Sequence, residues 1–152
     1  MKMNNSVIRI VLGVIIAPWL YIVVWTLPLL EHSAFHKWVV INTFFAYLVF
    51  LVFAGISHFA LKKLNAAKLW SYCVVMFVVA VALDLVLSLW SLSGYTSNYY
   101  SQTQVVEDGS ITAAGYLLQV KEALINGIVS SGVMAIFWFI SIFKPSSKVA
   151  NA

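Results

Sequence analysis

The chain has 152 residues, of which 62% are hydrophobic and only 9% are charged. A soluble domain is ordinarily about half apolar and about a quarter charged, and a chain this short cannot bury so much apolar surface in one core. The composition therefore excludes a soluble globular protein and indicates a single domain, residues 1–152, of helices packed in a lipid bilayer.

The net charge of +4 does not indicate nucleic-acid binding. The nine basic residues are scattered beside apolar runs, whereas a nucleic-acid surface carries a basic stripe with interleaved aromatic side chains. We therefore expect no nucleic-acid partner. Cys73 is the single cysteine and lies inside an apolar run, so the chain forms no internal disulfide.

Apolar stretches of about 20 residues can cross the roughly 30 Å of hydrocarbon in a bilayer as helices. Four such stretches are present, at about residues 8–30, 38–61, 69–92 and 123–143. The first could be a signal peptide, but its apolar run exceeds a usual h-region and no small-residue cleavage site follows. We therefore expect an all-α integral membrane bundle of four helices, kinked in the first where Pro18 and Pro28 interrupt it.

The basic residues predict the orientation of the bundle, since short cytoplasmic loops carry an excess of Lys and Arg. With both termini cytoplasmic (N-in/C-in), the outer side holds two bases, Lys37 and Lys121, and the acidic residues Glu31, Glu107, Asp108 and Glu122. The inner side then holds the other seven bases, Lys2, Arg9, Lys62, Lys63, Lys68, Lys144 and Lys148. This topology leaves a short loop of about residues 93–122 outside.

The loop after the first stretch carries Glu31, His32 and His36. On one helical turn the two histidines would share a face, and together with the carboxylate they could hold zinc or copper. Loops at a membrane boundary also carry such residues simply because they are wet, and neither a third histidine nor a cysteine lies nearby. We therefore predict no metal and no other cofactor. Glu31, His32 and His36 are the residues that would be the ligands of a metal ion here.

Asp84 lies near the middle of the third stretch, in the run VVAVALDLVLSLW. An aspartate at that depth costs about 2.5–3.5 kcal/mol, so we expect it to face other helices rather than lipid. At similar depth lie Tyr47, Asn126 and Ser130, with Ser88 one turn along the same helix. None is a base, so we expect a protonated Asp84 that hydrogen-bonds Ser130, Asn126 or Tyr47. Asp84 at this depth has two possible roles. It either exchanges protons with a solute or forms a hydrogen bond that holds neighbouring helices together.

The loop of about residues 93–122 is polar and holds a hairpin signal. Asp108-Gly109 lies between two short β-prone pieces in QVVEDGSIT, which is typical of a tight two-residue turn. The same segment carries Tyr95, Tyr99 and Tyr100 just outside the third stretch. These tyrosines can anchor at lipid headgroups or contact a partner.

The helix of the fourth stretch is predicted to begin before the membrane does, near Thr112, because TAAGYLLQVKEALINGIV keeps apolar residues at helical spacing. About a third of such a helix would stand above the bilayer. Tyr116, Leu117 and Val120 lie on this stalk. They either contact a partner or pack on the loop itself.

The sequence shows no enzymatic constellation: it has no Ser-His-Asp set at one depth, no paired carboxylates in a span and no glycine-rich phosphate loop. We therefore predict no catalytic residue. In size and topology the chain resembles small four-span bacterial inner-membrane proteins, among them the immunity proteins that block pore-forming toxins. We expect a non-catalytic protein with such an accessory or immunity-like role, whose partners are the bilayer and another membrane protein or a second copy. The alternative is an oligomeric proton-linked carrier or channel centred on Asp84.

Overall fold

The computed structural model describes residues 5–100 and 102–143. This part of the chain is mostly helical and contains four helical segments that are long and apolar enough to cross a membrane, Asn5–Leu29, Phe35–Lys63, Leu69–Leu92 and Ala113–Ser141. The number and order of the predicted helices are thereby confirmed. The loop before the last helix, where a hairpin was predicted, forms a small three-stranded sheet.

The first helical segment is interrupted at Pro18 and Pro28, as predicted. It consists of α1 (Asn5–Ile16), α2 (Pro18–Thr26) and a 3-10 turn, η1 (Leu27–Leu29). Proline lacks a backbone N–H and its ring clashes with the preceding turn, so the α-helical ladder stops before Pro18. Pro28 lies within η1, where the helix tightens before the chain turns.

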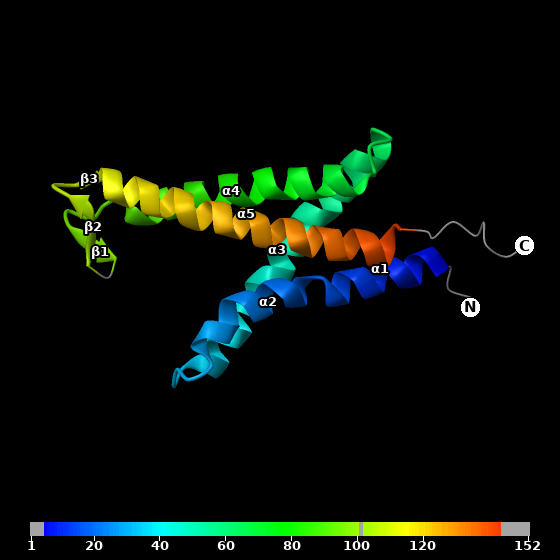
Figure 1. The fold of residues 1–152 in the computed structure, drawn as a ribbon, viewed down its shortest axis with the longest axis horizontal. Coiled ribbons are helices and arrows are strands. Elements are labelled where there is room, and N and C mark those ends of the chain that lie inside the picture. The colour runs from blue at the N-terminus through cyan, green and yellow to red at the C-terminus, as the bar shows by residue number, and fades with distance from the viewer. Residues whose placement is uncertain (1–4, 101, 144–152) are drawn as a thin grey trace, which may run out of the picture.

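The remaining helices are α3 (Phe35–Lys63), α4 (Leu69–Leu92) and α5 (Ala113–Ser141). Figure 1 shows α4 and α5 side by side along most of their length, with α1 packed along the C-terminal part of α5. Helices α2 and α3 pack on each other and diverge from α4 and α5 toward the loop that joins them. The bundle is therefore V-shaped.

Two ends of the bundle can be distinguished. The start of α1 and the end of α5 lie at the same end as the α3–α4 loop, and this is called the closed end. The sheet and the α2–α3 loop lie at the opposite, open end. The main apolar core lies toward the closed end and consists of Ala17, Phe50, Ala54, Leu61, Tyr72, Met76, Val133, Met134 and Phe137.

Glycine allows the helices around α5 to approach one another closely. A Cβ at Gly13 of α1 would overlap Ser141 Oγ of α5, and a Cβ at Gly127 of α5 would lie 2.7 Å from Val81 Cγ2 of α4. Small residues of this kind mark the faces on which membrane helices pack. Helix α5 is thus the centre of the bundle.

Hydrogen bonds tie the helices together at the closed end. Arg9 donates from Nε to the carbonyl of Ile140 at 2.8 Å and from Nη2 to that of Phe143, which satisfies the free carbonyls at the end of α5. Trp138 Nε1 donates to the carbonyl of Ala67 at 3.1 Å. His58 Nδ1 of α3 and the Tyr72 hydroxyl of α4 are 2.8 Å apart.

The sheet forms a cap over the start of α5. Its strands are β1 (Asn98–Tyr100), β2 (Thr103–Glu107) and β3 (Ser110–Ile111), antiparallel in the order β1-β2-β3. Asp108 and Gly109 have φ of 47° and 75°, as a type I′ turn requires, so the predicted hairpin is confirmed. Strand β1 was not predicted.

The cap is fixed to α5 by packing and by a helix cap. Val105 and Val106 are buried with Leu92, and a Cβ at Gly115 would lie 2.5 Å from the Val105 carbonyl oxygen. The Thr112 hydroxyl accepts from the Gly115 N–H at 3.0 Å and donates to the Gln104 carbonyl at 2.7 Å. The predicted helix start near Thr112 is confirmed. At about 1.5 Å per residue, the resulting helix is longer than a bilayer core requires.

Candidate functional site

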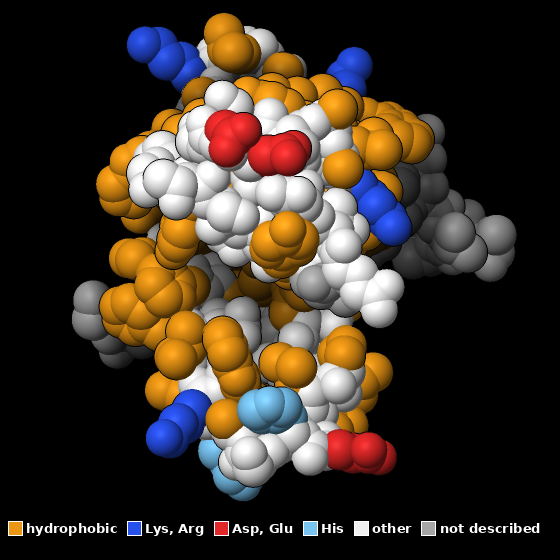
Figure 2. Space-filling view, turned by 90° about the vertical axis from the view of Figure 1, so that its left-hand side faces the viewer, with side chains coloured by type: hydrophobic (Ala, Val, Ile, Leu, Met, Phe, Trp, Pro, Cys, Tyr) orange, Lys and Arg blue, Asp and Glu red, His pale blue; other side chains and the backbone are white. Residues whose placement is uncertain are grey.

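A cavity of about 170 Å³ lies between the helices where α2 and α3 diverge from α4 and α5. All four long helical segments contribute to its walls, which are mainly apolar. Seen from the open end, Figure 2 shows a hollow between an upper lobe, which carries an acidic pair, and a lower lobe, which carries histidines. The polar side chains among the lining residues are Tyr21, Asn42, Asp84, Asn126 and Ser130.

Asp84 lies on the cavity face of α4 together with Met76, Ala80, Leu83 and Leu87. This face follows from helical spacing, and it points the carboxyl between the helices, as expected. No Lys, Arg or His is among the described residues that line the cavity.

The hydrogen bonds expected of Asp84 are not formed. Its Oδ2 is buried and has no hydrogen-bond partner within the described part of the chain. Asn126 and Ser130 line the same cavity, but among the described residues neither bonds the Asp84 carboxyl. A buried acceptor without a partner loses its bonds to water and gains none in exchange.

Tyr21 and Asn42 complete the polar lining, and neither was among the predicted site residues. The Tyr21 hydroxyl donates to Asn126 Oδ1 at 3.5 Å, which is at the limit of a hydrogen bond. Asn42 Nδ2 donates to the carbonyl of Trp38 on its own helix at 2.9 Å. The depth of Tyr21 in the first apolar stretch, equal to that of Asp84, was the signal that could have identified it.

Tyr47 and Ser88 are not among the residues that line the cavity. The Tyr47 hydroxyl donates instead to the carbonyl of Ile15 at 2.5 Å, three residues before Pro18. Proline leaves carbonyls of the preceding turn without their usual donors, so Tyr47 serves the kink rather than Asp84. Ser88 lies one turn of α4 toward the cap, where its carbonyl accepts from Ser91 Oγ.

Glu31, His32 and His36 are exposed in the α2–α3 loop and the first turn of α3. They do not share a helical turn, because α3 begins only at Phe35. His32 Nδ1 accepts from the Ala34 N–H at 3.1 Å. Within residues 5–100 and 102–143, no group of three or more potential metal ligands is present.

The candidate partner residues lie on the surface of the cap and of the first turns of α5. Tyr95, Tyr99 and Tyr100 are 51%, 61% and 56% exposed. Tyr116 is 50% exposed and Leu117 is 72% exposed. Leu117 therefore does not pack on the loop, which was one of its two predicted roles.

The arrangement offers hydrogen-bond acceptors and apolar walls. Nδ2 of Asn42 is bonded to its own helix, whereas the buried Oδ2 of Asp84 accepts no hydrogen bond from the described residues. The cavity is therefore suited to a ligand that donates hydrogen bonds and also carries an apolar part. Comparison of the chain with protein-family models, with curated proteins and with solved structures finds no match.

Proposed function

We propose that this protein is a non-catalytic, multi-pass protein of a bacterial inner membrane that recognises another membrane protein at its outer side. Four long apolar helices support the membrane location. The distribution of bases supports cytoplasmic termini: Arg9, Lys62, Lys63 and Lys68 lie toward the closed end, and Lys37 and Lys121 toward the open end. Lys2, Lys144 and Lys148, which enter the same argument, lie outside the described residues. With this orientation the cap would lie on the extracytoplasmic side of the membrane.

The order of the cap is the observation that carries the proposal. Val105 and Val106, 2% and 1% exposed, hold the sheet against α5, while Tyr99 and Tyr100 remain more than half exposed on β1. A preorganised surface loses little conformational entropy when a partner binds. Tyrosine side chains provide large contact areas with few rotatable bonds, which is why they are common in recognition surfaces.

A photo-reactive amino acid at position 100, incorporated in native membranes, tests this proposal. We expect one specific adduct with a different protein, and none from position 59, where the native Phe59 is 74% exposed on α3. The double substitution Tyr99→Ser and Tyr100→Ser should leave insertion intact and prevent the adduct formed from position 116. Identical adducts from positions 100 and 59 would count against recognition by the cap.

A second candidate function, a small proton-linked carrier, is favoured by the cavity and by the unpartnered Oδ2 of Asp84. Ionisable groups inside membrane segments frequently mark proton pathways. Four spans enclose little pathway alone, so a carrier would act as a pair. A homodimer cross-linked through α4 or α5, together with solute-driven proton uptake into vesicles that Asp84→Asn abolishes, would support it. Proton uptake that persists in Asp84→Asn would contradict it.

A further inference from the structure

We infer that the cavity beside Asp84 is a binding site for a short-chain primary alkylammonium ion. The inference goes beyond recognition by the cap. It shares its site with the carrier candidate but concerns equilibrium binding only, so it requires neither transport nor a partner protein.

The charge of the ligand follows from the surroundings of Asp84. Its buried Oδ2 has no partner among the described residues, and no basic side chain is found in the cavity lining. Burial of an acceptor, and still more of a carboxylate, is unfavourable unless a donor or a cation compensates it. An ammonium ion in the cavity would supply both a hydrogen-bond donor and the compensating positive charge.

The number of donors follows from the oxygen atoms around the cavity. A primary ammonium has three N–H donors, and the cavity presents acceptor oxygens on Asp84 of α4 and on Asn126 and Ser130 of α5. Asn126 Oδ1 accepts only a long contact of 3.5 Å from Tyr21, so it can accept a shorter bond from a ligand. A quaternary ammonium lacks these donors and would bind more weakly.

The apolar tail follows from the remaining walls. Phe45, Val49 and Phe50 of α3 and Leu87 of α4 line the cavity opposite or beside the polar groups. Aromatic rings also attract a nearby cation through their π faces. A volume of about 170 Å³ is larger than a bare ion requires, since one water occupies about 30 Å³ in the liquid.

A metal ion fits the cavity less well than an amine. Hard cations such as calcium and magnesium are held by several oxygen ligands, commonly including more than one carboxylate. Asp84 is the one carboxylate among the described lining residues, and the described chain holds no group of three potential metal ligands.

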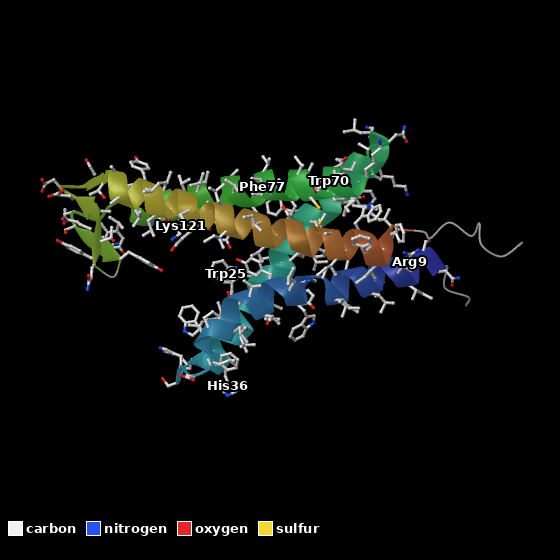
Figure 3. The ribbon with its side chains drawn as sticks, in the orientation of Figure 1. Arg9, Trp25, His36, Trp70, Phe77 and Lys121 are labelled. Carbon is white, nitrogen blue, oxygen red and sulfur yellow. The ribbon has the colours of Figure 1, made fainter. Side chains whose placement is uncertain are left out.

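A row of polar residues on α5 runs from the cap toward the cavity. Gln119, Glu122, Asn126 and Ser130 follow one another at helical spacing from the cap to the cavity. Glu122 is only partly buried and lies one turn nearer the cap than Asn126, where its charge attracts cations. In Figure 3, Lys121 of α5 and Trp25 of α2 are labelled on the two limbs of the bundle that diverge toward the open end.

Calorimetric titration of the purified protein in lipid nanodiscs with n-butylammonium tests the inference. We expect saturable binding of butylammonium. Tetramethylammonium should bind much more weakly because it has no N–H donors, and butanol should bind much more weakly because it has no charge. Asp84→Asn should weaken butylammonium at least tenfold, because a charge-assisted hydrogen bond is lost. Asn126→Ala should weaken it less.

Ser88→Ala is the matched control, because Ser88 lies one turn from Asp84 on α4 and outside the cavity lining. It should bind butylammonium like the unmodified protein. Equal affinity of Asp84→Asn and the unmodified protein, or equal affinity for butylammonium and tetramethylammonium, would overturn the inference. If Asp84→Asn does not fold, the ligand comparison on the unmodified protein and Asn126→Ala decide it. The assay contains no partner and no gradient, so failure of the proposed recognition or of transport leaves its result unchanged.

Discussion

The two ends of the bundle are built differently. At the closed end, Arg9, Trp138 and the His58–Tyr72 pair link neighbouring elements by hydrogen bonds of 2.8 to 3.1 Å, over a core that four helices share. Toward the open end, the side-chain hydrogen bond between α2 and α5 in the described part of the chain is the long Tyr21–Asn126 bond of 3.5 Å. The hydrogen bonds between elements are concentrated at the closed end, where the helices converge. Asp84 Oδ2, which has no partner among the described residues, lies where the helices separate.

This difference separates stability from the candidate functions. Side chains inside a bilayer gain little from the hydrophobic effect between helices, so packing and hydrogen bonds hold the bundle together. When those contacts are concentrated at one end, the other end can retain a polar cavity without loss of the fold. Substitutions at the closed end should therefore affect stability, and those at the open end should affect binding.

The largest effect is expected from Gly13→Leu at the closed end. Even a Cβ at this position overlaps Ser141 Oγ, so a leucine must force α1 away from α5. We expect a loss of about 3 kcal/mol in stability, at the upper end for overpacked cores, measured by thermal unfolding in detergent. Gly55→Leu is the control, because a Cβ at Gly55 meets nothing within 4 Å. Equal destabilisation by both substitutions would mean that α1 and α5 are not closely packed.

Arg9→Ala should have the next largest effect. It removes the charged donor from the carbonyls at the end of α5, at an expected cost of about 1.5–3 kcal/mol. Arg9→Lys should restore only part of this stability, since an ammonium cannot reproduce the spread of guanidinium donors. The same unfolding midpoint for all three proteins would rule out a stabilising contact between Arg9 and α5.

A smaller effect, confined to the cap, is expected from Gly109→Val. Gly109 has φ of 75°, which a β-branched side chain adopts only with strain of about 1–2 kcal/mol. Hydrogen exchange of the β2 and β3 amides should accelerate, while the closed end stays protected. Asp108→Asn is the control, because asparagine also tolerates the left-handed conformation at φ of 47°. Accelerated exchange in both ends of the molecule would show that the cap and the closed end unfold together.

The smallest effect is expected from Trp25→Phe. The Trp25 Nε1 is buried and has no partner among the described residues, so its removal abolishes no hydrogen bond. We expect a change in stability within about 0.5 kcal/mol of zero, because the lost aromatic area and the removed unsatisfied donor act in opposite directions. A loss of more than about 2 kcal/mol would indicate a hydrogen bond to this nitrogen.

Features encoded by short segments could be predicted from the sequence. Helix lengths follow from apolar runs, the break at Pro18 from the missing N–H, and the turn at Asp108-Gly109 from their tolerance of positive φ. Strand β1 could not be predicted, because its residues are polar or aromatic without alternation and its register shifts between Asn98 and Tyr99.

The site was predicted in part, because depth along a helix is easier to infer than rotation about it. Asp84, Asn126 and Ser130 share a depth and line one cavity. Tyr47 lies next to Ala46 in the sequence, but a step of one residue turns a side chain by about 100°. Ala46 therefore lines the cavity while Tyr47 reaches Ile15. The divergence of α2 and α3 depends on contacts between distant segments, which periodicity does not encode.

Thiol labelling at two positions of α3 tests the difference between the ends most directly. In a Cys73→Ala background, Asn42→Cys introduces a thiol in the cavity lining and Ser57→Cys introduces one in a buried position, 6% exposed, toward the closed end. A charged, membrane-impermeant maleimide added from the cap side should label position 42 rapidly and position 57 slowly or not at all. Equal labelling of both, or protection of position 42, would contradict an open cavity at one end of a bundle closed at the other.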